Sequence, residues 1–249
     1  MFKKITREDG KIPLFWYDSL DSTNNEAKRR AAELPMPAVI VADTQSAGRG
    51  RMGRSFFSPQ GTGLYFTYVT DRASFAETVG LTAAAAVATA RAIYAVSGIE
   101  VEIKWVNDLL VGGKKVAGIL CERFAAEGRT FVAVGIGINL TTAAGDFPEE
   151  LRKKAGSLGV SVDVRRHLAV ALAEGLDALV CALPDRAFME EYRARSAVLG
   201  RCVRYIENGV SYEGEAVAID DDGALCVEIE GSLRRLASGE ISLSYENLK

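Results

Sequence analysis

The chain contains 249 residues, of which 48% are hydrophobic and 25% are charged, and its formal net charge is −3. This composition is typical of a globular protein, and the net charge argues against a general attraction to nucleic acid or to anionic membranes. The four cysteines form no Cys-x-x-Cys pair and the chain has a single histidine, so a structural zinc site of the usual Cys/His kind is not expected.

The apolar segments of the chain predict neither export nor membrane insertion. The N-terminal residues contain no apolar run of the kind found in a secretory signal. The longest apolar stretch, residues 81–96, is rich in alanine and is interrupted by threonine and arginine, so we expect it to be too short and too mixed to span a bilayer. The sequence therefore predicts a cytoplasmic protein with reduced thiols and no membrane partner.

The first part of the chain predicts a helix and two strands around one long loop. The pattern Thr23-x-x-Glu26 is typical of a capping box and predicts a helix that ends near Leu34, before two prolines. Apolar, β-branched runs predict strands at 39–44 and 64–70. Residues 45–63 between them hold five glycines and three arginines without apolar periodicity. A loop of this length in a compact domain usually has a function.

The middle of the chain predicts a second helix and further strands. Ser74-x-x-Glu77 is another capping pattern, and the helix that it opens should run to about Ser97. Its many alanines suit close packing against a sheet. Strands are expected at 101–105 and 131–140, and Gly112-Gly113 between them predicts a hairpin with a turn of the primed type.

The C-terminal part predicts two helices and then a small β-barrel. One helix should be capped by Asp163 and the next should begin at Pro184. Short strands then alternate with typical hairpin turns at Asn208-Gly209, Asp222-Gly223 and Glu230-Gly231-Ser232. We therefore expect two domains, residues 1–196 and residues 197–249.

The segment 48–54, Gly-Arg-Gly-Arg-Met-Gly-Arg, is the first that suggests chemistry. Its glycines allow the backbone to approach a ligand, and arginine binds carboxylates and phosphates through two hydrogen bonds. The segment could thus wrap an anion made from a carboxylic acid and a nucleotide. Taken alone, it fits a solvated basic loop or an RNA-binding segment better. It is not a Walker motif, which needs Gly-x-x-x-x-Gly-Lys-Ser/Thr.

A second group of polar residues is expected around the predicted hairpin. The strand that ends at Lys104-Trp105-Val106 is followed by Asn107 and Asp108, and the returning strand brings Lys115 back beside them. Asp108 could hold Mg²⁺, which prefers few carboxylates together with phosphate oxygens. Lys115 could neutralise charge that develops on a phosphate. An Asn-Asp turn with exposed lysines is an equally good interpretation of this segment alone.

The third segment is Gly-Ile-Gly-Ile-Asn at 135–139. It lies within a predicted strand and not at a turn from strand to helix, so a dinucleotide-binding interpretation is poor. Small residues at these positions would let a ligand lie against the sheet.

Together these segments resemble the catalytic region of the biotin–protein ligase family. The matching segments occur in the order typical of the family, from about residue 14 to residue 248: DSTN (21–24), TQSAGRGRMGRSFFSPQGTGLYFT (44–67), KWVNDLLVGGKKVAGIL (104–120), GIGIN (135–139) and GEISL (239–243). The long string around 48–63 is highly specific, and the combination is more so.

The resemblance implies an α+β fold, with a mixed-sheet catalytic domain related to lipoate ligases and class II synthetases and an SH3-like barrel behind it. It also implies two reaction steps. Biotin reacts with ATP and Mg²⁺ to give biotinyl-5′-AMP, and a lysine of a biotin carboxyl carrier protein then takes the biotinyl group. The carrier would belong to acetyl-CoA carboxylase or to a related carboxylase, and the ligase would be a monomer or a homodimer.

The resemblance also assigns roles to individual residues. Contacts to biotin are expected from Ser22, Thr23, Asn24, Gln45, Gly48, Arg49, Gly50, Arg51, Lys115 and Gly118. Contacts to the nucleotide are expected from Arg51, Arg54, Phe56, Asn107 and Asn139. Lys115, Arg49 and Arg51 would be catalytic, with the two arginines facing the carboxylate and the phosphate, and Asp108 would hold Mg²⁺.

The sequence departs from the family pattern in four ways. Val106 stands where the family usually has proline, and Phe56 stands where it usually has a tryptophan that covers the adenine. We expect Phe56 to stack on the adenine less well, with packing in the core as the alternative. Ser244 replaces an arginine that repressor-type members carry near the ATP phosphates. Those members also carry an N-terminal DNA-binding module of some sixty residues, which we expect to be absent, together with binding to specific DNA.

Two other functions remain open at this point. A lipoate or octanoyl transferase of the same superfamily would have a different glycine-rich loop. An RNA-binding module would use the arginines of 48–54 and the barrel, but the acidic net charge and the scarcity of aromatic residues other than Phe56 and Phe57 near those arginines argue against it.

Overall fold

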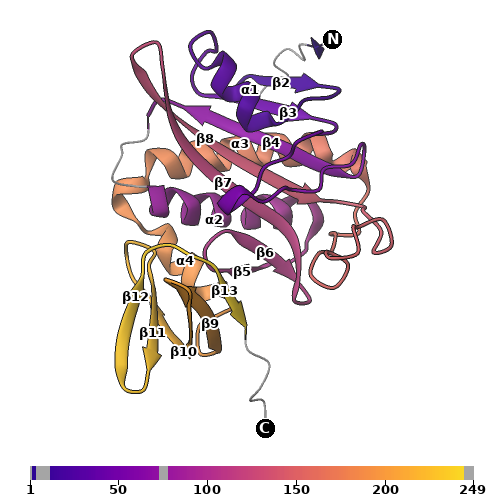
Figure 1. The fold of residues 1–249 in the computed structure, drawn as a ribbon. Coiled ribbons are helices and arrows are strands. Elements are labelled where there is room, and N and C mark those ends of the chain that lie inside the picture. Colours follow the sequence, from indigo (N-terminus) through magenta and orange to yellow (C-terminus); the bar gives the residue numbers. More distant parts are fainter. Residues whose placement is uncertain (1, 4–11, 73–77, 244–249) are drawn as a thin grey trace.

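This computed structural model describes residues 2–3, 12–72 and 78–243. The larger part of the protein contains a mixed β-sheet with the strand order β1-β2-β3-β4-β8-β7-β6-β5 (Figure 1). Its strands are β1 (Phe2–Lys3), β2 (Leu14–Tyr17), β3 (Ala38–Ala42), β4 (Gly63–Thr70), β5 (Glu102–Lys104), β6 (Asp108–Val111), β7 (Lys114–Ala126) and β8 (Arg129–Asn139). Strands β2 and β3 run parallel, whereas the other neighbours described are antiparallel. The expected mixed sheet is therefore confirmed.

The two faces of this sheet carry different layers, because side chains alternate along a strand. Val39 and Val41 of β3 join a large core that includes helices α2 (Thr78–Ser97), α3 (Arg165–Cys181) and α4 (Phe188–Ala194). Ala38 and Ile40 join a smaller core under helix α1 (Thr23–Arg30). Along β8, Gly135 and Gly137 fall on the face of α1, where they leave the sheet surface open.

The length and apolar character of helix α2 differ from what the sequence led us to expect. Its window Gly80–Ser97 is long and apolar enough to cross a membrane by length and composition, although residues 81–96 were expected to be too short and too mixed. In the protein, however, 67% of that window is buried. The alanines allow close packing, and Gly175 of α3 lies against Ala88. These contacts are those of a core helix.

A second sheet, with the order β12-β11-β10-β9-β13, follows the helices. Its strands are antiparallel: β9 (Cys202–Glu207), β10 (Val210–Ile219), β11 (Leu225–Ile229), β12 (Ser232–Leu236) and β13 (Ile241–Leu243). Asn208-Gly209 and Glu230-Gly231 have positive φ at both residues, as primed turns require. Buried residues of this sheet continue the large core, and Trp105 donates a hydrogen bond to the carbonyl of Gly223 at 2.9 Å.

Two of the expected helix caps are wrong. Ser22, not Thr23, occupies the cap position of α1, and Thr23 instead donates its backbone N–H to Gln45 Oε1, with its hydroxyl 3.2 Å from the same atom. The side chain of Ser161 accepts the backbone hydrogen bond of Asp163 and caps the short 3₁₀ helix Val162–Val164 that leads into α3, and Val164 precedes α3 itself. The Ser22 side chain makes no capping hydrogen bond, whereas the Ser161 hydroxyl binds a backbone N–H that a cap at Asp163 would have left free. The expected cap at Ser74 lies outside the described residues.

Candidate active site

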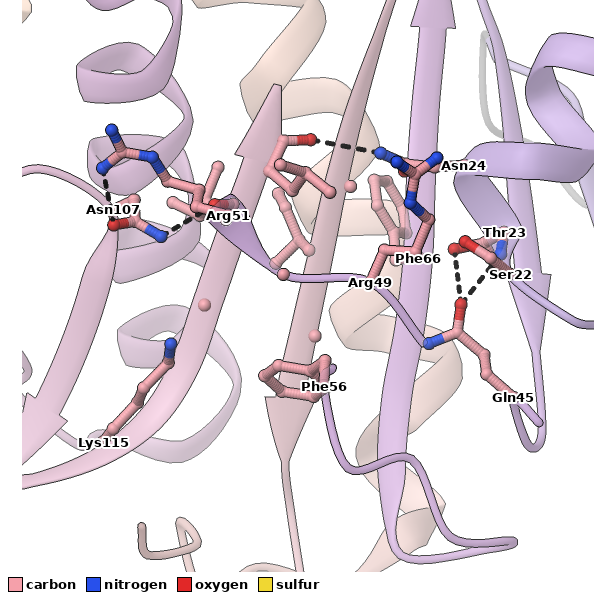
Figure 2. A pocket seen from close by; sticks show the side chains of 17 residues that line it. Ser22, Thr23, Asn24, Gln45, Arg49, Arg51, Phe56, Phe66, Asn107 and Lys115 are labelled. Atoms are coloured by element: carbon pink, nitrogen blue, oxygen red, sulfur yellow. Dashed lines mark hydrogen bonds between the residues drawn. The ribbon is translucent and has the colours of Figure 1, made fainter. Parts of the chain in front are cut away.

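A narrow cavity of about 50 Å³ lies on the α1 face of the sheet, between α1, the loop 45–63 and strands β7 and β8 (Figure 2). Its lining combines small, polar and basic residues from segments far apart in the sequence: Ser22, Thr23, Asn24, Gln45, Arg49, Gly50, Arg51, Phe56, Phe66, Asn107, Lys115, Gly118, Ile119, Leu120, Gly135, Ile136 and Gly137. We call it the inner cavity.

One end of the inner cavity is a buried polar network. The backbone N–H of Thr23 donates to Gln45 Oε1 at 2.8 Å, and Gln45 Nε2 donates to Ser58 Oγ at 2.9 Å. Thr67 Oγ1, on β4, lies 2.8 Å from Thr23 Oγ1 and 2.7 Å from Asn24 Oδ1. The side chains at this end of the cavity are uncharged, and they satisfy one another's hydrogen bonds.

Glycines form the floor of the inner cavity. A Cβ at Gly135 would lie 2.2 Å from Asn24 Oδ1, and a Cβ at Gly137 would lie 2.4 Å from the ring of Phe56. A Cβ at Gly118 would lie 2.9 Å from Lys115 Nζ. At 135 and 137 a side chain would displace Asn24 or Phe56, so glycine is favoured there, whereas at 118 the flexible end of Lys115 would have to move.

The segment 48–54 folds back on itself like a narrow hairpin. Phe56 N–H donates to the carbonyl of Gly48 at 2.9 Å and Gly50 N–H donates to that of Arg54 at 2.7 Å, with Met52 in a left-handed conformation at the tip. A Cβ at Gly48 would lie 2.5 Å from the carbonyl oxygen of Phe56. Glycine is therefore needed at 48 for the two arms to meet.

The arginines of this hairpin point to different partners. Arg51 Nη1 donates to Asn107 Oδ1 at 3.2 Å, and Asn107 Nδ2 donates to the carbonyl of Ile119 at 2.9 Å. Arg49 Nη1 instead contacts Asn25 Oδ1 at 3.2 Å and Glu122 Oε1 at 3.5 Å. The structure thus brings Arg51, but not the guanidinium of Arg49, to the side of Asn107.

Lys115 lies at the far end of the inner cavity from the polar network, and its Nζ is 2.6 Å from Asp108 Oδ1 (Figure 2). The backbone of Lys115 is fixed by hydrogen bonds to the segment after β8, because its N–H donates to Lys154 and its carbonyl accepts from Gly156. The ammonium group is therefore held at a defined place beside a carboxylate.

A larger cavity of about 450 Å³ adjoins the inner one and shares Gly50, Arg51, Phe56, Asn107 and Lys115 with it. We call it the outer cavity. Six of its lining residues are basic and two are acidic: Arg51, Arg54, Lys104, Lys115, Lys153 and Lys154 against Asp108 and Glu240. Residues 239–243 of the C-terminal part complete its wall, and Arg54 Nη1 donates to Glu240 Oε1 at 2.6 Å. An excess of positive charge in a cleft attracts polyphosphates.

Phe56 stands on the border between the two cavities. Its half-buried ring lies over the glycine floor, 6.5 Å from the ring of Tyr65 and 6.0 Å from Lys115 Nζ. Phe56 lines both cavities and is not among the residues of either core cluster. This position favours contact with a ligand over a role in the core.

Sequence similarity to known protein families agrees with this geometry. Residues 16–139 match the Biotin/lipoate A/B protein ligase family, and residues 198–244 match the Biotin protein ligase C terminal domain. The "Bifunctional ligase/repressor BirA" of Bacillus subtilis is 34% identical over 242 residues, which cover 92% of this chain and 74% of that protein. The chain belongs to the biotin/lipoate protein ligase family.

Other members of the family extend this similarity. The "Biotin--[acetyl-CoA-carboxylase] ligase" of Mycobacterium tuberculosis is 33% identical over 246 residues, covering 88% of this chain and 85% of that protein. The solved biotin protein ligase of Aquifex aeolicus in complex with biotin and ATP has a TM-score of 0.77 and 26% identity, covering 94% of this chain and 99% of that chain. The expected resemblance and the expected α+β fold are both confirmed.

The residues that the sequence singled out for the ligase site all line at least one of the two cavities, except for two. Gly48 shapes the hairpin, and Asn139 is buried with its Nδ2 bonded to the carbonyl of Gly156 at 2.9 Å. Asn139 thus holds the segment beside Lys115, and contact with a nucleotide would have to come through that segment. Ser244, the departure noted near the phosphates, lies outside the described residues.

Sequence reasoning missed several residues of the site. Thr67 and Ser58 complete the polar network, and Glu122 accepts hydrogen bonds from Asn24 and Lys28. A signal for Glu122 was present, because it follows Gly118 at even spacing along β7 and so faces the cavity side of the sheet. Lys153 and Lys154 had no signal, since they come from an irregular segment.

Proposed function

We propose that this chain is a biotin protein ligase that activates biotin with ATP to biotinyl-5′-AMP and transfers the biotinyl group to a lysine of a biotin carboxyl carrier protein. The observation that carries the proposal is that two unlike cavities join at residues that include Lys115 and Arg51. The uncharged, hydrogen-bonding end of the inner cavity suits an uncharged head group, and the cationic outer cavity suits a triphosphate. Lys115 and Arg51 lie where a carboxylate and a phosphate would meet.

The proposed biotin site is the inner cavity. Its head-group end would be formed by Ser22, Thr23 and Gln45, with Asn24 as support and Gly118 under the ligand. Gly48, Gly50 and the arginines at 49 and 51 would close over it. A ligand that entered would have to displace the ring of Phe56 from the glycine floor or lie beside it, since the free cavity holds only about 50 Å³.

The proposed nucleotide site is the outer cavity, with Arg51, Arg54, Phe56 and Asn107 in its wall. In the first step, a carboxylate oxygen of biotin forms a bond to the α-phosphorus of ATP, and the bond to the bridging oxygen of pyrophosphate breaks. Negative charge on the phosphoryl oxygens increases in the transition state, and Lys115 and Arg51 stabilise it there. Arg49 would have to leave Glu122 in order to take part.

The donor set fits a magnesium ion that arrives with ATP better than one held by the protein alone. Asp108 is the carboxylate at the junction and is already paired with Lys115, and no cluster of three or more potential metal ligands occurs in the described part of the chain. Mg²⁺ typically takes one or two carboxylates plus phosphate oxygens. When bound, it would screen the phosphate charges, and Asp108 is the residue that would hold it.

In the second step, a neutral lysine amine of the carrier attacks the acyl carbon of the mixed anhydride. The bond between that carbon and the phosphate oxygen breaks, AMP leaves with the electron pair, and the amine loses a proton. Related ligases that are named for acetyl-CoA carboxylase support a carrier of this type. We further propose that the reaction takes place in the cytoplasm and that the domains meet between residues 196 and 197.

The direct test is exchange of radiolabelled pyrophosphate into ATP. Exchange that depends on biotin, followed by biotin transfer to a purified carrier domain, is the expected result. Lipoate serves as the competing substrate, because the matching family model also covers lipoate ligases. Exchange with lipoate but not with biotin would refute the proposal.

A further inference from the structure

Behind the polar end of the inner cavity lies a carboxylate that the proposed reaction does not use. Glu122 lies on β7 with its side chain only 17% exposed, and three polar side chains converge on it. Lys28 Nζ lies 2.8 Å from Oε1, Asn24 Nδ2 lies 2.9 Å from Oε2, and Arg49 Nη1 lies 3.5 Å from Oε1. Burial opposes ionisation, but the hydrogen bonds of Lys28 and Asn24 and the charges of Lys28 and Arg49 outweigh it, so the pKa of the Glu122 carboxyl is lowered.

An ionised carboxylate accepts hydrogen bonds and cannot donate them. The side of the Asn24 amide that faces Glu122 must therefore be its NH₂ group, which also donates to the carbonyl of Leu120 at 3.3 Å. This fixes the Oδ1 atom of Asn24 toward Thr67, at 2.7 Å. Because an amide oxygen only accepts, the single hydroxyl proton of Thr67 must point to Asn24.

The direction of the Thr67 hydroxyl also determines the hydrogen bonds of Thr23, which lies in the wall of the cavity. With its own proton committed to Asn24, Thr67 can only accept from Thr23, whose Oγ1 lies 2.8 Å away. The remaining acceptor near the Thr23 hydroxyl is Gln45 Oε1 at 3.2 Å. Whichever of the two takes the Thr23 proton, it is used inside the network, and Thr23 presents lone pairs to the cavity.

We propose that Glu122 is a positioning residue that sets the hydrogen-bond direction of the head-group end of the cavity, so that Thr23 accepts a hydrogen bond from an N–H of the bound ring. The proposal rests on the proposed function, because it takes biotin, whose head group is a cyclic urea, as the ligand. It goes further by naming a residue that does not touch the ligand but determines which ring atoms the cavity accepts.

The charge of Glu122 matters as well as its shape. In Glu122→Gln, the new amide could keep its oxygen toward Asn24 only by aiming its NH₂ group at Lys28 and Arg49. The opposite orientation satisfies those two cations but presents NH₂ to Asn24, so that the Asn24 amide turns over. Its NH₂ group would then face Thr67, and the hydroxyl protons of Thr67 and Thr23 would be free to reverse toward the cavity.

The test compares biotin with two carbamate analogues, in each of which one urea N–H is replaced by a ring oxygen of nearly the same size. Wild type should prefer biotin to at least one analogue by about 100-fold in affinity, because the analogue puts an acceptor against an acceptor. Glu122→Gln should lower that preference about tenfold while weakening biotin itself. Isothermal titration calorimetry measures both without turnover, and kinetic assays should show the change in KM for biotin rather than in kcat.

Lys28→Gln is the matched control, since it removes the same ion pair but leaves the carboxylate beside Asn24. It should keep the preference of wild type, and Glu122→Asp, which keeps the charge, should keep more of it than Glu122→Gln. An unchanged preference in a folded Glu122→Gln protein, or an equal loss in Lys28→Gln, would overturn the assignment. Wild type that binds no biotin would refute the proposed function instead, so the two failures are distinguishable.

Discussion

The inner and outer cavities are built in opposite ways. The inner cavity rests on regular structure, since its glycine floor belongs to β7 and β8 and its polar wall joins the first turn of α1 to β4. The outer cavity is formed by the hairpin loop, the β6–β7 turn, the irregular segment 151–155 and the C-terminal residues 239–243. The polar end of the first is uncharged and internally hydrogen-bonded, whereas the second carries unbalanced positive charge along its wall.

This difference predicts different sensitivities in the two cavities. A buried hydrogen-bond network responds to small changes in shape or proton direction, because each unsatisfied group is costly. A wide cationic cavity responds to charge and tolerates changes of shape, since exposed ion pairs are individually weak. We therefore expect substitutions in the inner cavity to weaken the binding of biotin and those in the outer cavity to weaken the binding of ATP. Substitutions at the shared residues should affect both ligands.

The largest effect is expected at Lys115, where the cavities join. Lys115→Ala should reduce biotin-dependent pyrophosphate exchange by about 100-fold or more, because one preorganised charge at the reacting centre typically contributes about 3 kcal/mol. Lys114→Ala is the control, since Lys114 is exposed and lines neither cavity. Exchange within about threefold of wild type would remove Lys115 from the reacting centre and would show that the two cavities do not meet there in function.

Gly135→Ala tests whether a substitution in the inner cavity changes the KM for biotin without changing the KM for ATP. The new methyl group would lie 2.2 Å from Asn24 Oδ1, so Asn24 must move and the polar network must break. The KM for biotin should rise by more than about tenfold while the KM for ATP changes by less than about twofold. Gly145→Ala, with open space around the new methyl group, controls for the substitution itself. An equal rise in both KM values would show that the cavities are not separate.

Phe56 borders both cavities, so its substitution shows which ligand its ring contacts. Phe56→Ala should weaken ATP binding about tenfold and biotin binding less, since the loss of an aromatic contact costs roughly 0.5–1.5 kcal/mol beyond its buried area. Phe56→Trp should hold or improve the affinity for ATP. Titrations of biotin alone, and of ATP in its presence, separate the two ligands. A lower melting temperature with equal losses for both would instead assign Phe56 to the core.

Most residues that line the inner cavity could be named from the sequence, because this cavity depends on local patterns. The glycines at 118, 135 and 137 lie in strands with clear alternation, and the hairpin at Gly112-Gly113 has positive φ at both residues, as expected. Family resemblance then supplied the chemistry. The cap at Thr23 was wrong because Thr23 binds Gln45, 22 positions away, and the cap at Asp163 was wrong because the hydroxyl of Ser161, two residues earlier, accepts the local backbone hydrogen bond.

The outer cavity was much less predictable from the sequence. Lys153 and Lys154 reach it because the backbone of segment 154–156 pairs with Lys115, a long-range contact without a local pattern. The contact of Glu240 with Arg54 joins residues separated by 186 positions. Charged side chains that meet across irregular segments leave no periodicity in the sequence, so only the folded structure brings them together.

The smallest effect is expected at that Arg54–Glu240 pair, which ties the hairpin loop to the C-terminal part. The two side chains are 64% and 45% exposed, so their pairing should contribute only about 0–1 kcal/mol. Glu240→Gln should therefore raise the KM for ATP no more than about threefold and leave the KM for biotin unchanged.

The charge exchange Arg54→Glu with Glu240→Arg should recover part of the loss seen in Arg54→Glu alone. A double-mutant cycle measured at low and high salt tests this, because an exposed pair weakens with salt. Coupling that is strong and independent of salt would mean that the outer cavity, like the inner one, is held by a desolvated network, and the contrast between the two cavities would fail.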